Sequence, residues 1–204
     1  MDLVRRGYDA TADTYAAARA APGPERRWVE GLLALLPGGS RVVDLGCGNG
    51  RPVAAALSAA GHRVTGVDFS LGQLARARRL APDARLVAAD LADLAFRAAR
   101  FDAAVAWDSV FHLPPALQPP LFRRLRGWLA PNAPVLLTLG GEAGEIRADH
   151  LGAPTYYGAL APGDALAALA ASGLDLLEHA FDQPRHLVVL ARAAAPPPAT
   201  ASPP

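Results

Sequence analysis

Short runs rich in β-branched residues alternate with longer segments rich in alanine, leucine and arginine along most of the chain. The short runs have the length of buried strands, and the longer segments have the length of helices that cover a sheet. This alternation predicts parallel strands joined by helices. We expect strands at 41–45, 63–68, 84–88, 102–107, 133–139, 174–180 and 186–192, and helices at 51–60, 71–80, 116–129 and 163–171.

The last two predicted strands are separated only by the short connection Phe-Asp-Gln-Pro. A parallel crossover needs a dozen or more residues, so these two strands should form an antiparallel hairpin. The predicted fold is therefore α/β: a Rossmann-like, doubly wound sheet of seven strands, mostly parallel, with an antiparallel hairpin at its C-terminal end.

The 204 residues fit a single domain, which we expect to span 1–192. Residues 1–37 contain two helix-like segments separated by Ala-Pro-Gly-Pro and should form an N-terminal helical cap. The Ala/Pro-rich segment 193–204 can build neither a core nor a helix, and we expect it to be a disordered tail.

Composition excludes several kinds of chemistry. Twenty basic and nineteen acidic residues give a formal charge of +1, which provides no general attraction for nucleic acid or an anionic membrane. All twenty basic residues are arginines, so lysine Schiff-base chemistry is excluded. Cys47 is the single cysteine and can form no internal disulfide, which favours a reducing, cytoplasmic location. The start lacks an apolar signal region, and no apolar stretch reaches the roughly 20 residues of a membrane span.

A glycine-rich turn follows the first predicted strand. The strand carries Asp44 near its end, and Gly46, Gly48 and Gly50 come directly before a helix. Glycines let ligand atoms approach the backbone, and the first turn of a helix offers unpaired amides, so this is the arrangement of a nucleotide-binding turn. A dinucleotide fingerprint, G-x-G-x-x-G, would place its third glycine at position 51, which is Arg51.

Acidic residues also end the second and third predicted strands. Asp68 ends the second strand, where a carboxylate can accept hydrogen bonds from both ribose hydroxyls, and Phe69 beside it offers a flat surface for an adenine ring. Asp90 follows the third strand. Asp68 alone would also suit NAD. The ordered series of Asp44, Asp68 and Asp90 at three successive strand ends distinguishes better between nucleotide cofactors.

The pattern of Asp44, Gly46, Gly48 and Gly50 resembles motif I of the class I S-adenosylmethionine-dependent methyltransferases, and the resemblance extends over roughly residues 8–192. It implies that S-adenosyl-L-methionine is the cofactor and that Asp90 binds the adenine amino group. The resemblance also implies that the tyrosines of the N-terminal segment close over the cofactor. It adds four cofactor-binding candidates: Tyr8, Tyr15, Leu91 and Trp107.

The fourth strand is followed by Trp-Asp-Ser-Val-Phe-His-Leu, which resembles the motif that faces the methyl group in this family. An acceptor hydroxyl or amine must lose a proton, and His112 is our candidate general base because its ordinary pKa lies near neutral pH. Asp108 is the second catalytic candidate, either as a base or to orient an amine. A carboxylate or thiolate acceptor would need no base.

Residues 140–160 follow the fifth strand, where this fold often inserts a substrate lid, and we expect a glycine-hinged loop whose Tyr156 and Tyr157 line the acceptor site. The acidic and histidine residues of this loop have no metal-site spacing, and we predict no metal. The preferred function is methyl transfer to an oxygen or nitrogen of a small molecule, without nucleic-acid or membrane partners. A nicotinamide-dependent reductase and a non-catalytic cofactor-binding regulatory module remain as alternatives, and the oligomeric state stays open.

Overall fold

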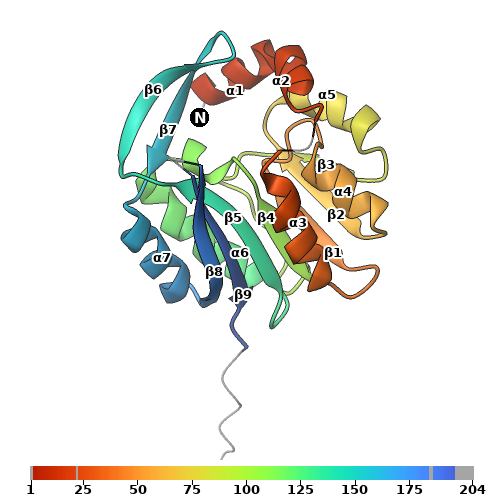
Figure 1. Ribbon diagram of the computed structural model, residues 1–204, viewed down its shortest axis with the longest axis vertical. Coiled ribbons are helices and arrows are strands. Elements are labelled where there is room, and N and C mark those ends of the chain that lie inside the picture. Colours follow the sequence, from red (N-terminus) through yellow and green to blue (C-terminus); the bar gives the residue numbers. More distant parts are fainter. Residues whose placement is uncertain (1, 22, 184–185, 196–204) are drawn as a thin grey trace, which may run out of the picture.

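The computed structural model describes residues 2–21, 23–183 and 186–195. Its centre is a seven-stranded sheet with the order β3-β2-β1-β4-β5-β9-β8 (Figure 1). The strands of this sheet are β1 (Arg41–Leu45), β2 (Arg63–Asp68), β3 (Arg85–Ala88), β4 (Ala103–Ala106), β5 (Pro134–Gly140), β8 (Leu174–Gln183) and β9 (His186–Ala193). The first five strands are parallel, and β9 is antiparallel to both of its neighbours. The predicted mostly parallel sheet with a C-terminal hairpin is confirmed.

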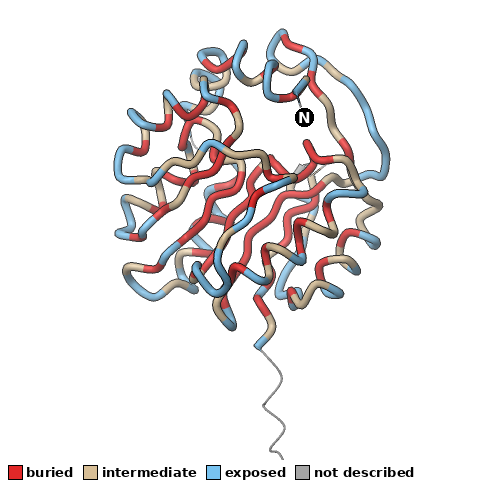
Figure 2. Tube along the Cα trace, turned by 180° about the vertical axis from the view of Figure 1, so that it is seen from behind, coloured by how far each residue is buried: buried red, intermediate tan, exposed pale blue. Residues whose placement is uncertain are grey.

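Helices cover both faces of the sheet. The helices are α1 (Asp2–Ala10), α2 (Ala12–Ala18), α3 (Glu25–Ala34), α4 (Val53–Ala59), α5 (Leu71–Leu80), α6 (Gln118–Trp128) and α7 (Pro162–Ala171). Two 3-10 turns, η1 (Val110–His112) and η2 (Pro115–Leu117), precede α6. The central strands β1, β4 and β5 are almost entirely buried, as Figure 2 shows in red, whereas the outer strands β3 and β8 are mainly half-buried or exposed.

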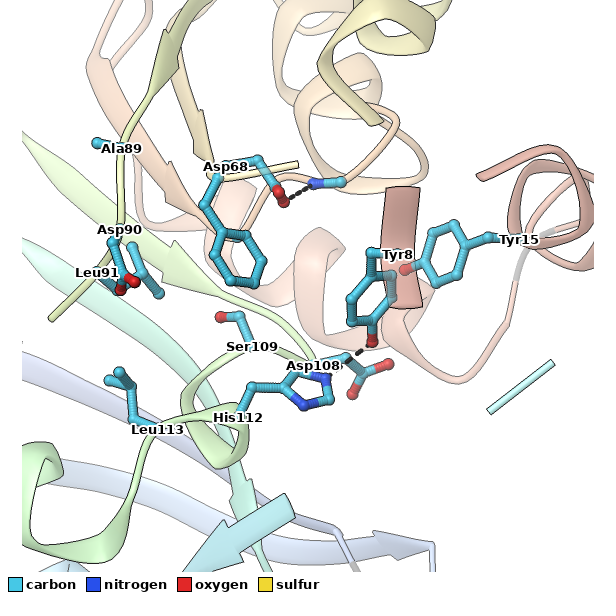
Figure 3. Close-up of a pocket in the computed structure, with 13 residues that line it drawn as sticks. Tyr8, Tyr15, Asp68, Ala89, Asp90, Leu91, Asp108, Ser109, His112 and Leu113 are labelled. Atoms are coloured by element: carbon cyan, nitrogen blue, oxygen red, sulfur yellow. Dashed lines mark hydrogen bonds between the residues drawn. The ribbon is translucent and has the colours of Figure 1, made fainter. Parts of the chain in front are cut away.

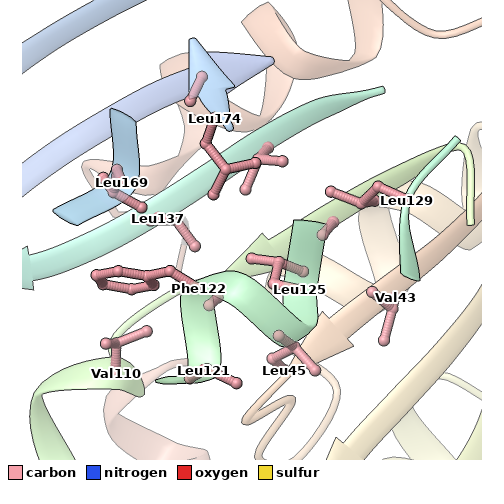
Figure 4. Close-up of a cluster of buried hydrophobic side chains, with 14 of the residues drawn as sticks. Val43, Leu45, Val110, Leu121, Phe122, Leu125, Leu129, Leu137, Leu169 and Leu174 are labelled. Atoms are coloured by element: carbon pink, nitrogen blue, oxygen red, sulfur yellow. The ribbon is translucent and has the colours of Figure 1, made fainter. Parts of the chain in front are cut away.

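Side chains alternate between two apolar clusters along the buried strands. In β4, Ala104 and Ala106 belong to the cluster under α6 and α7, whereas Ala103 and Val105 belong to the cluster under α3 and α4. This period of two is the geometry of a strand buried on both faces. Figure 4 shows the first cluster, where leucines and Phe122 of α6 pack on the sheet.

The N-terminal segment contains three helices instead of the two that we expected. The break lies at Thr11, whose φ of −101° and ψ of 10° depart from helical values; its hydroxyl donates to the carbonyl oxygen of Gly7 at 2.9 Å beside the regular backbone bond at 3.0 Å. Figure 1 shows α1 and α2 over one end of the sheet, the end at which the parallel strands finish.

The segment predicted as a glycine-hinged loop at 140–160 is instead an antiparallel ribbon of β6 (Gly144–His150) and β7 (Ala153–Ala159), so that prediction was wrong in form. The connecting residues Leu151 and Gly152 have φ of +56° and +89°, the left-handed pair that a tight hairpin turn requires. The ribbon forms a sheet of its own, separate from the seven strands, and β7 packs against α1.

At the C-terminus, β9 extends through Ala193, the first residue of the predicted tail, and the backbone N–H of Ala194 donates to the Gly173 carbonyl at 2.9 Å. These two residues are therefore ordered. Ala195 is described and exposed, and positions 196–204 of the predicted tail lie outside the described residues. Among the described helices, none has the length and apolar composition needed to cross a membrane.

Candidate active site

A pocket opens at the carboxyl ends of β1, β2 and β4, beneath the N-terminal helices (Figure 3). In this strand order the chain leaves β1 toward opposite sides of the sheet, to β2 and later to β4, and such a reversal point is where open α/β sheets bind ligands. The residues that line the pocket are Tyr8, Tyr15, Gly46, Gly48, Asp68, Phe69, Ala89, Asp90, Leu91, Asp108, Ser109, His112 and Leu113.

The glycine turn forms one wall of this pocket. Gly46 has φ of +77°, and a Cβ at this position would lie 2.3 Å from the Cβ of Ser109, so a side chain cannot be accommodated there. The amides of Gly46 and Cys47 both donate to the carbonyl oxygen of Val67. These bonds hold the turn against the end of β2 and leave bare backbone facing the pocket.

The carboxyl groups of Asp44 and Asp68 are both buried next to the glycine turn. Asp68 lines the pocket, and its oxygens accept from the amides of Gly48 at 2.9 Å and Ser70 at 2.8 Å. Burial raises its pKa to about 6, against the effect of these hydrogen bonds. Burial and the nearby charge of Asp68 raise the pKa of Asp44 to about 7. Asp44 Oδ2 has no hydrogen-bond partner among the described residues.

The opposite side of the pocket is formed by Phe69, Asp90 and Leu91. One oxygen of Asp90 accepts from the amide of Ala92 at 2.9 Å, which fixes the carboxylate at the end of β3. An apolar ring and a leucine therefore border the pocket next to two acidic acceptors. This combination suits a purine nucleoside, with a flat apolar surface for the base and acceptors for its amino and hydroxyl groups.

His112 stands at the floor of the pocket with both ring nitrogens engaged. Nδ1 lies 2.8 Å from the carbonyl oxygen of Tyr156, which can only accept, so Nδ1 carries the proton. Nε2 lies 2.8 Å from the hydroxyl of Tyr8 and therefore accepts from it when the ring is neutral. Burial lowers the pKa of His112 to about 4, which keeps the imidazole neutral at physiological pH.

The N-terminal helices act as a roof over the site. The rings of Tyr8 and Tyr15 meet edge to face at 5.6 Å, and Arg19, at the end of α2, forms an ion pair with Asp108. Asp108 has φ of +53°, an unusual conformation for a residue other than glycine, and such conformations concentrate at functional sites. Asp108 thus connects the roof to the end of β4.

Two further contacts fasten the roof to α5. Asp9 accepts from the hydroxyl of Ser70 at 2.6 Å and from the amide of Gly72 at 3.0 Å, at the N-terminus of α5. Arg76, one turn later, donates through Nε to Asp13 at 2.9 Å. The sequence pattern gave no indication of these contacts or of Arg19, because the partners are far apart along the chain.

Most of the site residues predicted from the sequence meet in the pocket, and five do not line it: Asp44, Gly50, Trp107, Tyr156 and Tyr157. Gly50 is explained by packing, because a Cβ there would lie 2.9 Å from that of Ala81. Trp107 packs in the apolar cluster under α3 and α4. The pocket also includes residues that the sequence reasoning passed over: Ala89, Ser109 and Leu113.

A second hollow lies between the β6–β7 ribbon and the start of β9. Its lining includes the rings of Phe111, Tyr157 and His186, together with backbone of four glycines at 140, 141, 144 and 158. The ring of His112 lies 5.1 Å from that of Phe111 and 5.0 Å from that of Tyr157. His112 therefore stands between the two hollows. The hydroxyl of Tyr156 instead donates to Glu145 at 2.7 Å, on the exposed ribbon.

Residues 42–132 match a family described as a methyltransferase domain. The chain is 35% identical over 119 residues to a demethylmenaquinone methyltransferase of Beutenbergia cavernae, covering 57% of this chain and 47% of that protein. It is 35% identical over 159 residues to a trans-aconitate 2-methyltransferase of Paracidovorax citrulli, covering 64% and 60%. The chain thus spans about half the length of the curated relatives it matches.

Among solved structures, an S-adenosylmethionine-dependent methyltransferase from Mesorhizobium loti is similar, with a TM-score of 0.69 and 25% identity. That likeness covers 83% of this chain and 98% of the other. The matched family segment runs from β1 to the end of α6 and contains the glycine turn, Asp68, Asp90, Asp108 and His112. Residues 42–132 therefore match the methyltransferase domain family, and the fold of the chain is that of the S-adenosylmethionine-dependent methyltransferases.

Proposed function

We propose that the protein transfers a methyl group from S-adenosyl-L-methionine to an oxygen or nitrogen atom of a small molecule. The observation that carries this proposal is the meeting of Gly46, Gly48, Asp68 and Asp90 in one pocket at the reversal point of the sheet. The cofactor supplies a methyl group on a sulfonium, which is already a good leaving group. The protein then has to align the acceptor, exclude water and receive a proton.

The pocket fits this cofactor residue by residue. Bare backbone at Gly46 and Gly48 leaves room for the amino-acid part, and Asp68 is the acceptor for the ribose hydroxyls. Phe69 and Leu91 would enclose the adenine, with Asp90 at its amino group. Asp44, with its unpartnered and buried Oδ2, adds negative charge close to the turn, which favours a cationic ligand.

We propose His112 as the group that receives the acceptor's proton. Its neutral ring has a lone pair on Nε2, and the Nδ1 bond to Tyr156 holds the ring in place. A base with a pKa of about 4 is weak at rest. It is sufficient here because an oxygen or nitrogen that gains a methyl group becomes strongly acidic as the new bond forms. Tyr8 must give up Nε2 before an acceptor can reach it.

Asp108 and the roof have a positioning role in this proposal. The ion pair with Arg19 holds the Asp108 carboxylate at the pocket wall, where it can orient an amine of the acceptor or of the cofactor. Tyr8 and Tyr15 close over the pocket and would exclude water from the reacting atoms. The roof is therefore the element that has to open for exchange of ligands.

The acceptor, in this proposal, enters from the hollow beside the β6–β7 ribbon. Phe111, Tyr157 and His186 provide aromatic surface for a planar, largely apolar molecule, and Tyr156 supports the site through its backbone bond to His112. Glu142 is the one acidic side chain on this lining, and no arginine is among the described lining residues, which disfavours a highly anionic acceptor. We also propose a cytoplasmic location, which the single cysteine favours.

Calorimetric titration with S-adenosylmethionine and, separately, with NAD tests the cofactor. We expect micromolar binding of the former and none of the latter; the reverse result would establish the nicotinamide alternative. Incubation with methyl-labelled cofactor and a metabolite extract, followed by mass spectrometry, tests transfer and identifies the acceptor. Cofactor binding without any labelled product would favour the regulatory module.

With an acceptor in hand, His112→Gln tests the base. We expect a lower rate on an oxygen or nitrogen acceptor with little change in cofactor affinity, because the ring touches the acceptor side of the pocket. His179→Gln is the matched control, because His179 is exposed on β8, far along the chain from the site. Equal rates for both variants would remove His112 from the mechanism.

A further inference from the structure

A third hollow lies at the N-terminal ends of the parallel strands, at the end of the sheet opposite to the first pocket. Arg41 starts β1, Arg63 starts β2 and Arg85 starts β3, and all three line this hollow together with Arg100, which precedes β4. The arginines are scattered in the sequence, and the parallel topology gathers them because it brings the starts of neighbouring strands to the same end of the sheet. Arg41 and Arg63 are direct partners in the register.

Most of this positive charge is not compensated by the protein. Arg41 is paired with Asp102, with nitrogen–oxygen distances of 2.8 and 3.0 Å. Arg63, Arg85 and Arg100 form no ion pair with any acidic side chain in the described ranges. Asp83 is the one acidic side chain on the described lining. Like charges held together repel one another, and an anion placed among them relieves this repulsion.

Two further polar side chains on the lining of the same hollow have an atom without a hydrogen-bond partner among the described residues. His62 is only 9% exposed, and its Nδ1 makes no hydrogen bond within the described part of the chain. The hydroxyl oxygen of Ser58, on the same lining, is buried and unpartnered as well. Buried polar atoms normally have hydrogen-bond partners, so two such atoms beside three guanidinium groups that lack an acidic partner favour a ligand with hydrogen-bond acceptors.

We propose that this hollow binds a small molecule that carries two or more phosphate groups. Arg63 lies opposite Arg41, Arg85 lies opposite Thr65 two residues further along β2, and Arg100 precedes β4, so the guanidinium groups are spread over the lining and suit a ligand with several anionic groups better than a single carboxylate. Ser58 can supply a hydroxyl donor beside the hollow once its buried oxygen turns toward the ligand. The ligand does not compete with the methyl donor, because the proposed cofactor pocket lies at the other ends of the same strands.

A small ligand fits the observations better than a nucleic acid does. The formal charge of the whole chain is +1, so no long-range field attracts a polyanion. The unpartnered side chains are inside a hollow instead of along an extended surface stripe. A small polyphosphate and a nucleic acid both present phosphate groups, and their relative affinities distinguish the two kinds of ligand.

Calorimetric titration of the full chain with inorganic tripolyphosphate tests the proposal without any measurement of enzymatic activity. We expect one binding site per chain, with an affinity that is the same in the presence of S-adenosylhomocysteine. The double variant Arg63→Gln, Arg100→Gln should bind about a hundredfold more weakly, since each charge-assisted contact is worth about a factor of ten. The double variant Arg78→Gln, Arg123→Gln, which removes the same charge from exposed helix positions, should bind like the wild type.

Several outcomes would overturn the proposal. These are absence of saturable binding at low ionic strength, an equal loss in both double variants, and tighter binding of a short single-stranded oligonucleotide than of tripolyphosphate. Ser58→Ala provides a second check, because it leaves the charge unchanged. A tripolyphosphate affinity identical to that of the wild type in this variant would contradict the part assigned to the buried donors.

Discussion

The affinity for S-adenosylmethionine should fall as the pH falls through 6. The carboxyl group of Asp68 has its pKa raised from 3.8 to about 6 by burial, and the proposed ribose hydroxyls can donate only to its ionised form. The sign follows from linkage: cofactor binding favours the deprotonated group, so binding releases a proton wherever the free protein still holds one.

The magnitude follows from the same value. With a pKa of about 6, roughly one tenth of the free molecules carry an ionised Asp68 at pH 5, and nearly all of them do at pH 8. If the bound cofactor keeps the carboxylate ionised throughout, the dissociation constant should rise about tenfold between pH 8 and pH 5. At pH 6 about half a proton should be released for each cofactor bound.

Calorimetry across this pH range, in two buffers with different enthalpies of ionisation, measures both quantities. Asp68→Asn should bind weakly and without the tenfold pH dependence, whereas Asp93→Asn, at an exposed position, should behave like the wild type. A wild-type affinity that is constant from pH 5 to pH 8 would refute the reasoning. A tenfold loss that persists in Asp68→Asn would assign the proton to another group and refute it equally.

Three further substitutions have defined outcomes in urea unfolding. Asp44→Asn should raise the free energy of unfolding at pH 8 by up to about 4 kcal/mol and change it little at pH 4. The reason is that burial raises the pKa of Asp44 from 3.8 to about 7, so the fold loses stability as this group ionises. A pH-independent difference would contradict this. Gly46→Ala should lower the free energy of unfolding by about 2 kcal/mol, because its Cβ would collide with Ser109. A value equal to that of the wild type would mean that the turn can rearrange freely. Tyr8→Phe should lower the free energy of unfolding by about 1 kcal/mol through loss of the bond to His112, and faster amide exchange in α1 should accompany it; unchanged exchange would place the attachment of α1 elsewhere.

Much of the fold could be predicted because the buried strands follow local rules. The runs at 41–45 and 63–68 match β1 and β2 residue for residue, since each is a short run rich in β-branched residues that begins at an arginine and ends just before a turn or helix start. The β6–β7 ribbon escaped prediction for a physical reason. Most of β6 is exposed on both sides, so its sequence lacks the apolar alternation that identifies a half-buried strand.

The site was predictable to the extent that its residues lie at strand ends. Asp68 and Asp90 end successive parallel strands, and parallel order places such residues at one edge. Arg19 could not be predicted in the same way, because its partner Asp108 is 89 positions away and no period connects them. The arginines of the third hollow were missed for the same reason, although topology, once known, brings them together.

The roof, formed by α1 and α2, lies outside the two apolar clusters that pack on the sheet. Neither apolar cluster contains a residue of α1 or α2. These helices are attached by packing of α1 on β7, by the bond from Tyr8 to His112, and by the polar contacts of Asp9, Asp13 and Arg19. The apolar clusters that pack on the sheet are therefore separate from the residues that cover the site. Substitutions in α1 and α2 can therefore change which small molecules reach the pocket while both apolar clusters on the sheet stay the same.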